Sequence, residues 1–293
     1  MRSGDFAIVC DSGCDLPAAL LEELEVVSVA VGREGDDRMA LRLAEAYRTL
    51  AEQGYACVIS VHSSAEFSGS LDAARVAAAQ VADEVGVETL DSGVASVGTG
   101  MLVERLASWR SQGADGPRAL AAAHALSRSV RLLVVPTATA RLSRRRTRHH
   151  HASSLGRTAS TLRVRISGER ALFLLSRAAL TPLARATDLV ELTSRLVHAM
   201  SAVAATEGAL VYALLETGDA RAVRAVEKPL DTNEFVSRCL GTAHADESVV
   251  ETIGAGAVGV AFMPARVYTA PFSELALLGL DSAVQPNQGA EGS

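Results

Sequence analysis

The chain has 293 residues, of which 48% are hydrophobic, 21% charged and 4% aromatic, and its formal net charge is −6. This length and mixture predict a globular protein with one large domain or two ordinary ones, and the acidic balance argues against general nucleic-acid binding, which needs a basic surface. No segment approaches the run of about 20 apolar residues that a membrane span requires, and the N-terminus lacks the apolar core of a secretory signal, so we expect a cytoplasmic protein.

The first half of the chain alternates short apolar runs with helical patterns. Strands are predicted at residues 6–10, 26–31, 56–61 and 87–92, and residues 131–137 continue the series. Helices are predicted at 18–25, 40–54, 69–86, 94–113 and 116–130. Unbroken apolar strands that alternate with helices predict an α/β fold, with a parallel sheet covered by helices on both faces.

The pattern changes at residues 140–160, a polar and basic stretch that we interpret as a crossover between domains. The second half predicts a hairpin from 161–167 and 171–178, a helix at 187–205, a strand at 208–216, a helix at 217–232 and a strand pair within 248–264. The expected organisation is an N-terminal α/β domain at 1–147, a second α/β or α+β domain at 148–280 and a disordered tail at 281–293.

The four cysteines predict neither a disulfide framework nor a metal site. They form no CxxC pair, and Cys10 and Cys14 are separated by three residues with no histidine nearby. We interpret all four as thiols, and no metal or cofactor is expected.

A loop rich in serine follows the third predicted strand. Ser63, Ser64, Ser68 and Ser70 lie where that strand leads into a helix, and in open α/β sheets ligands bind at such strand ends. Hydroxyl groups beside the free N–H groups of a helix N-terminus can hold a carboxylate or a phosphate. The alternative is that Ser68 only caps the helix.

Two further strand ends carry an Asp-Ser pair, Asp11 with Ser12 and Asp91 with Ser92. Asp11 and Asp15 flank Ser12 and could bind a metal or act as bases, but helix capping is the favoured interpretation because no third oxygen ligand has suitable spacing. Asp91 and Ser92 repeat the pattern, and capping is again the plain alternative. The basic stretch 141–151 is typical of a solvated loop, and it could also supply arginine to an anionic ligand. Its three consecutive histidines rarely converge on one metal ion.

Several segments, taken together, resemble the DegV-like family in order and spacing. They are "DSGCDLP", "SSAEFSGSLDAA", "LDSGVASVGTGMLVERLASW", "RLSRRR" and "IGAGAVGVAF". The resemblance covers nearly the whole chain before the tail. It implies a two-domain α/β protein that binds a long-chain fatty acid between its domains, and some members present the fatty acid to a kinase.

The resemblance also implies a carboxylate site. Ser63, Ser64, Ser68 and the adjacent Gly69 match the loop that holds the carboxylate, and Arg146 matches the arginine of a glycine-rich loop. Thr252 stands where the family has a histidine, in a loop with Gly254 and Gly256, and the family's threonine segment before the third strand is missing. Supporting loops are expected from six residues: Asp11, Ser12, Asp91, Ser92, Gly254 and Gly256.

The resemblance therefore implies a protein without catalytic residues of its own, which binds a fatty acid and offers the carboxylate to a separate fatty acid kinase. The alkyl tail would supply most of the binding free energy. Neither nucleic acid nor an integral membrane segment is expected. Two alternatives stay open: an enzyme that handles a small phosphate compound with Asp11, Asp91 and the serine loop, and a paralogue that has lost its ligand and serves as a regulatory partner.

Overall fold

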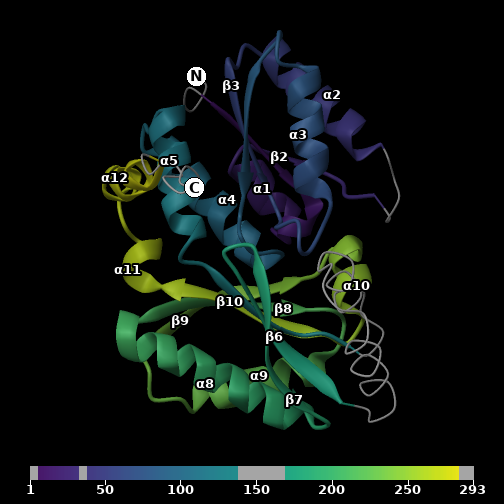
Figure 1. The fold of residues 1–293 in the computed structure, drawn as a ribbon, viewed down its shortest axis with the longest axis vertical. Coiled ribbons are helices and arrows are strands. Elements are labelled where there is room, and N and C mark those ends of the chain that lie inside the picture. Colours follow the sequence, from purple (N-terminus) through teal and green to yellow (C-terminus); the bar gives the residue numbers. More distant parts are fainter. Residues whose placement is uncertain (1–5, 33–37, 138–168, 284–293) are drawn as a thin grey trace, which may run out of the picture.

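The computed structural model describes residues 6–32, 38–137 and 169–283. Two sheets lie one above the other along the long axis of the molecule (Figure 1). We call the four-stranded sheet with its helices the upper lobe, and the six-stranded sheet with its helices the lower lobe. The expected boundary at residue 147 lies outside the described residues.

The upper sheet is parallel, as predicted. Its strands are β1 (Ala7–Asp11), β2 (Val26–Val29), β3 (Cys57–His62) and β4 (Gly86–Asp91), in the order β2-β1-β3-β4. The register pairs Cys10 with Val61 and His62 with Asp91, so the carboxyl ends of β1, β3 and β4 meet at one edge. This edge faces the lower lobe (Figure 1).

Helices cover both faces of the upper sheet, which confirms the predicted layering. One face packs on α2 (Met39–Glu52) and α3 (Ser70–Gln80), and the other on α4 (Val97–Ser111) and α5 (Gly116–Ser127). The short 3-10 helix η1 (Ser12–Cys14) and α1 (Ala18–Glu23) connect β1 to β2. Helix α4 is buried on nearly all sides because it contacts strands of both sheets.

The lower sheet is mixed and has the order β7-β6-β5-β10-β8-β9. Strand β5 (Arg131–Val135) is antiparallel to β6 (Arg170–Ser176) and β10 (Val258–Pro264), whereas β8 (Leu210–Glu216) is parallel to β9 (Ser237–His244). The prediction that residues 131–137 extend the parallel sheet is therefore wrong. An apolar run indicates that a strand is buried, and it does not indicate which sheet the strand joins.

The hairpin of the second half also differs from the prediction. It joins β6 to β7 (Ala179–Ala186) through Arg177 and Ala178, which have φ angles of 52° and 58°. Two positive φ angles in a two-residue loop are the geometry that suits the twist of a hairpin. The strand predicted at 161–167 lies outside the described residues.

Residues 248–253, predicted as part of a strand pair, belong instead to helix α10 (Glu247–Ile253). The Asp246 side chain accepts a hydrogen bond from the Ser248 backbone N–H at 2.9 Å, and Gly254 ends the helix with a φ of 90°. A capping acid and a terminal glycine outweigh the strand preference of the Val and Thr residues between them.

Helices α8 (Leu189–Glu207) and α9 (Ala220–Asp231) cover the lower face of the second sheet (Figure 1). Two C-terminal helices, α11 (Ala265–Tyr268) and α12 (Phe272–Ala283), were not predicted, and α12 returns to pack against α5 of the upper lobe. Helix α12 extends to residue 283, so the segment predicted as a tail begins inside a helix. Within the described ranges, no helix combines the length and the apolar character that a membrane span requires.

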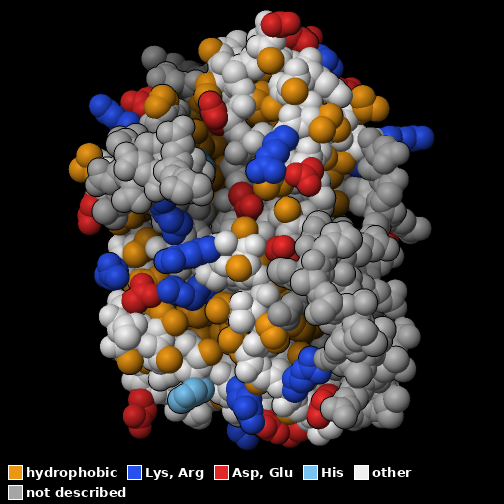
Figure 2. All heavy atoms as spheres, viewed as in Figure 1, with side chains coloured by type: hydrophobic (Ala, Val, Ile, Leu, Met, Phe, Trp, Pro, Cys, Tyr) orange, Lys and Arg blue, Asp and Glu red, His pale blue; other side chains and the backbone are white. Residues whose placement is uncertain are grey.

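The surface in Figure 2 mixes apolar and charged side chains, and Lys and Arg side chains gather on its left at the height of α11 and β9. Arg266 of α11 lies 3.7 Å from the Glu207 carboxylate, and Arg131 of β5 lies 2.6 Å from it. Glu207 therefore links α11, β5 and the end of α8 electrostatically.

Candidate functional site

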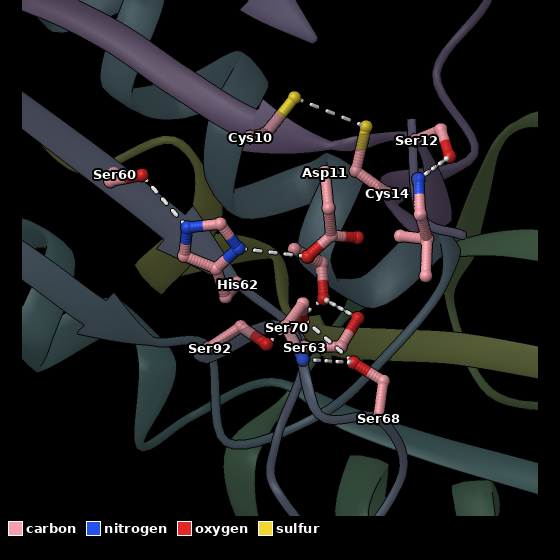
Figure 3. A network of polar contacts seen from close by, with 12 residues as sticks. Cys10, Asp11, Ser12, Cys14, Ser60, His62, Ser63, Ser68, Ser70 and Ser92 are labelled. Carbon is pink, nitrogen blue, oxygen red and sulfur yellow. Dashed lines mark hydrogen bonds and ion pairs between the residues drawn. The ribbon is translucent and has the colours of Figure 1, made fainter. Parts of the chain in front are cut away.

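The candidate site lies at the edge where β1, β3 and β4 end. Asp11 ends β1 and Ser12 follows it, Ser63 follows β3, and Ser92 follows β4 (Figure 3). Ser64 is the next residue after Ser63. Four of these side chains, all but Ser12, are at most 2% exposed. These polar side chains therefore lie together at one edge of the upper sheet, where four of them are buried.

A buried chain of hydrogen bonds leads through the upper sheet to Asp11. The Tyr47 hydroxyl donates to Ser60 Oγ at 2.7 Å, Ser60 Oγ lies 2.7 Å from His62 Nε2, and His62 Nδ1 lies 2.9 Å from Asp11 Oδ2. Since burial raises the pKa of Tyr47 to about 12, the Tyr47 hydroxyl stays protonated and Ser60 Oγ accepts its hydrogen bond. The Ser60 proton is then available to Nε2, which leaves Nδ1–H directed at Asp11.

The second carboxylate oxygen of Asp11, Oδ1, is buried and has no hydrogen-bond partner among the described residues. A Cβ atom built on Gly13 would lie 3.0 Å from this oxygen and 3.6 Å from Ser248 Oγ, so Oδ1 faces the turn η1 and helix α10 of the lower lobe. Sequence reasoning identified Asp11 as a supporting residue and missed His62. A single histidine at a strand end carries no signal of its own, because its partner Asp11 is 51 residues away.

The serines of the loop fall into two separate groups. Ser63 Oγ lies 3.4 Å from Thr99 Oγ1, and Thr99 Oγ1 lies 2.9 Å from Ser92 Oγ, so these three hydroxyls form one buried cluster. The Ser64 backbone N–H donates to the Val94 carbonyl at 2.7 Å, which fixes the start of the loop. Thr99, in the first turn of α4, was not predicted as a site residue.

Ser68 lies one residue before Gly69, which is the N-cap of α3 and makes no side-chain capping bond. Ser68 Oγ accepts from the Ser70 backbone N–H at 3.2 Å and lies 2.7 Å from Ser70 Oγ, at the start of α3. Gly69 is exposed, and a Cβ there would meet nothing within 4 Å. Ser68 and Gly69 therefore shape the helix start, apart from the buried cluster of Ser63.

The side chains of Asp91 and Ser12 each accept a hydrogen bond from a backbone N–H group. The Asp91 side chain accepts from the Gly93 N–H at 2.7 Å, and the Gly93 carbonyl accepts from the Ala178 N–H of the β6–β7 turn at 2.9 Å. Ser12 Oγ accepts from the Val31 N–H at 3.1 Å. Both side chains support the strand-end edge, and Asp91 also helps position a contact between the lobes.

Asp15 joins the two lobes directly. Its carboxylate accepts from Ser96 Oγ at the start of α4 and from the Asp246 backbone N–H at the start of α10, the latter at 2.7 Å. Asp15 and Ser96 have positive φ angles of 54° and 57°, which is uncommon outside glycine. Burial raises the pKa of Asp15 from its ordinary 3.8 to about 7, more than its two hydrogen bonds lower it.

The glycine loop after α10 packs on the ends of β5 and β8. The Thr137 N–H donates to the Ile253 carbonyl at 2.9 Å, and Thr217 Oγ1 donates to the carbonyls of Gly254 and Ala257 at 3.2 and 2.9 Å. Thr252 donates to the Ser248 carbonyl one turn back in α10, at 3.0 Å. The structure thus brings α10 to the edge that holds Asp11, with Thr252 bonded within its own helix. Gly256, with a φ of 78°, completes the loop.

Arg146 and the basic stretch lie outside the described residues, so their predicted role stays a prediction. The four cysteines are free thiols, and Cys10 and Cys14 lie 3.5 Å apart, sulfur to sulfur. The hydrogen bond to Cys14 and burial raise the pKa of Cys10 well above its ordinary value. Across the described parts of the chain, no three His, Cys, Asp or Glu side chains are grouped so that they could hold a metal ion.

Several solved structures have a fold similar to that of this chain. A DegV family protein from Corynebacterium glutamicum is similar with a TM-score of 0.74 and 18% identity, over 89% of this chain and 97% of that one. A fatty-acid-binding DegV family protein from Thermus thermophilus has a TM-score of 0.73 and 20% identity, over 90% and 100%. A stearic-acid-binding protein from Eubacterium ventriosum has a TM-score of 0.71 and 16% identity, over 90% and 99%.

No curated protein matches the sequence. The model of the DegV family, whose description is that of uncharacterised proteins, matches residues 39–265, well over half of the chain. The resemblance that the motifs indicated is confirmed, and the chain belongs to the DegV family.

Proposed function

We propose that this protein binds a long-chain fatty acid where its two lobes meet, with the head group at the strand-end edge, and that it is not itself a catalyst. The observation that carries the proposal is the buried hydroxyl cluster of Ser63, Ser92 and Thr99, which lies at the carboxyl ends of parallel strands and faces a second lobe. The same fold is found in a fatty-acid-binding protein from Thermus thermophilus and a stearic-acid-binding protein from Eubacterium ventriosum.

Burial of the alkyl tail would supply most of the binding free energy. At about 0.8 kcal/mol for each buried methylene, a sixteen-carbon chain gains roughly 10 kcal/mol before the costs of ordering. The polar contacts then mainly orient the chain and set which head groups are accepted. The proposed tunnel for the tail runs between the lobes, whose facing parts share one apolar core with residues from both lobes, including Leu90, Met101, Leu132 and Ala261.

The head group would be held by Ser63, with Thr99 and Ser92 behind it, and by backbone groups of the loop that Ser64 begins. Arg146 is proposed to approach the head group from the basic stretch. Presentation of the head group to a separate fatty acid kinase, with Arg144 to Arg146 as the docking residues, is part of the same proposal. Charge reversal at these three arginines should then reduce kinase-dependent phosphorylation of the bound lipid, and an unchanged rate would exclude the stretch as a docking site.

Extraction of the purified protein, followed by mass spectrometry of the extract, tests the proposal. We expect close to one equivalent of a fatty acid per chain, and binding of added hexadecanoic acid by protein from which lipid has been removed. Protein that is free of lipid and does not bind hexadecanoic acid would favour the alternative of a paralogue without a ligand.

A further inference from the structure

Asp11 offers a buried hydrogen-bond acceptor that the protein itself does not use. The side chain is 1% exposed, and Oδ1 has no partner among the described residues, while Oδ2 lies 2.9 Å from His62 Nδ1. A buried acceptor of this kind destabilises a protein unless a donor reaches it. The group that complements Oδ1 is therefore a hydrogen-bond donor.

The neighbouring side chains have their protons committed elsewhere. His62 Nδ1–H points at Oδ2, and the hydroxyls of Ser60 and Tyr47 continue that chain away from the site. Ser248 Oγ, on the side of α10 that Oδ1 faces, donates to the Asp246 carboxylate. Gly13 has no side chain above the oxygen, where a Cβ would lie 3.0 Å away.

The hydroxyl cluster also ends in an acceptor. Ser92 Oγ donates to the Val94 carbonyl at 3.1 Å, so the Thr99 proton serves the 2.9 Å contact with Ser92. The 3.4 Å contact between Ser63 and Thr99 is then made by the Ser63 proton, which leaves the lone pairs of Ser63 Oγ open. Figure 3 shows Ser63, Ser92 and the Asp11 carboxylate at the same edge of the sheet. The edge therefore presents acceptors to a ligand from both β1 and β3.

The charges around Asp11 are a second reason to expect an uncharged head group at this site. His62 of β3, Cys10 of β1 and Cys14 of η1 are its titratable neighbours, and the carboxyl groups of Asp15 and Asp246 lie beyond them. Burial, and then the charges of Asp246 and Asp11, raise the pKa of Asp15 to about 7. A ligand carboxylate would add a further negative charge beside the buried acids Asp11 and Asp15, and like charges at short range favour sharing a proton.

We infer that the site binds its acyl chain with an uncharged head group that donates a hydrogen bond to Asp11 Oδ1, so that a fatty acid is held as the protonated acid. This inference rests on the proposed function and specifies its ligand. It differs from the bound carboxylate that the sequence resemblance implies. It also means that a primary alcohol of the same chain length, which is a permanent neutral donor, is accepted without the cost of protonation.

Three sixteen-carbon probes test the inference on the full-length protein after lipid removal, by equilibrium dialysis from cyclodextrin. At pH 8 we expect 1-hexadecanol to bind roughly tenfold more tightly than methyl hexadecanoate, which accepts hydrogen bonds but donates none. Hexadecanoic acid should bind more tightly as the pH falls from 8 to 6. If hexadecanoic acid binds more tightly than 1-hexadecanol at pH 8 and gains no affinity at pH 6, the inference is wrong. The proposed function would then still stand.

The substitution Asp11→Asn provides the decisive variant. The Asn oxygen can still accept from His62, and the NH2 group then replaces the Oδ1 acceptor with a donor. We expect the order at pH 8 to reverse, with hexadecanoic acid bound more tightly than 1-hexadecanol. Asp72→Asn, the same change at an exposed residue of α3, is the matched control and should keep the wild-type order. An unreversed order in folded Asp11→Asn protein would contradict the inference, and if that variant does not fold, the order on the wild-type protein decides.

The same three probes give a different result if the proposed function itself is wrong. Wild-type protein that binds none of the three probes would contradict lipid binding itself, and the inference would fall with it.

Discussion

Ser63 is the residue whose hydroxyl stands at the open end of the buried cluster. Replacing it with alanine removes one ligand contact without leaving a buried donor unpaired, because Thr99 donates to Ser92. Ser63→Ala should therefore weaken hexadecanoic acid binding roughly fivefold and leave the melting temperature nearly unchanged. Ser111→Ala, an exposed serine bonded within α4, is the matched control, and equal affinities for both variants would mean that the head group lies elsewhere.

Ser68 provides a contrasting prediction at the residue scale. The structure uses this hydroxyl to accept from the Ser70 N–H at the start of α3. Ser68→Ala should lower the free energy of unfolding by about 1 kcal/mol, which is typical of one lost hydrogen bond, and leave lipid affinity unchanged. Urea unfolding and equilibrium dialysis separate the two effects, and a fall in affinity with unchanged stability would return Ser68 to the head-group site.

Some residues of the candidate site could be predicted from the sequence and others could not. The serine-rich loop and the acids at the strand ends were predictable, because strand ends of α/β sheets are where ligands bind. The division of the serines into Ser63 with Thr99 and Ser68 with Ser70 depends on how the loop folds back on α4, which the spacing does not encode. His62 could not be assigned either, since its meaning comes from contacts with Ser60 and Asp11 that form only in the folded sheet.

At the scale of elements, the buried parallel strands were predictable because β1 and β3 are short apolar runs between helical patterns. Helix α10 was not, because its Val and Thr residues favour a strand, and the capping bond from Asp246 decides the outcome. Strand β5 was predicted as a strand and assigned to the wrong sheet. Its residues are buried on both faces, as a strand in the middle of either sheet would be.

The glycine loop that ends α10 gives a prediction for elements. Gly254 has a φ of 90°, and an added Cβ would lie 1.8 Å from Thr137 Oγ1, so Gly254→Ala combines backbone strain with a clash at the end of β5. We expect a loss of more than about 2 kcal/mol in the free energy of unfolding. Gly218→Ala, with a φ of 88° and nothing within 4 Å, should lose only the strain. Equal losses in urea unfolding would mean that the contact with Thr137 is unimportant.

At the scale of the whole molecule, Asp15 links stability to pH across the lobe interface. Because its pKa rises from 3.8 to about 7 on folding, the folded state binds more protons between these values, and stability falls as the pH rises from about 4 to 7. Above about pH 7 the buried charge exerts its full cost. Asp15→Asn keeps an acceptor for the Asp246 N–H and removes the charge, so the variant should be more stable than wild type at pH 8.

Thermal unfolding at several pH values measures this effect. The difference between Asp15→Asn and wild type should be near zero at pH 4 and grow through pH 7. A variant that is less stable than wild type at pH 8 would show that the ionised carboxylate holds the lobes together. Asp115→Asn, at the exposed cap of α5, is the matched control and should show no such growth with pH.

The proposed function requires an alkyl chain between the lobes, with its head group beside Ser63 and Asp11. A crystal structure of the protein with hexadecanoic acid tests this most directly. We predict an extended tail among apolar side chains of both lobes and a head-group oxygen within hydrogen-bond distance of Asp11 Oδ1. Side chains that fill this region completely, or a lipid bound at another surface, would contradict the account.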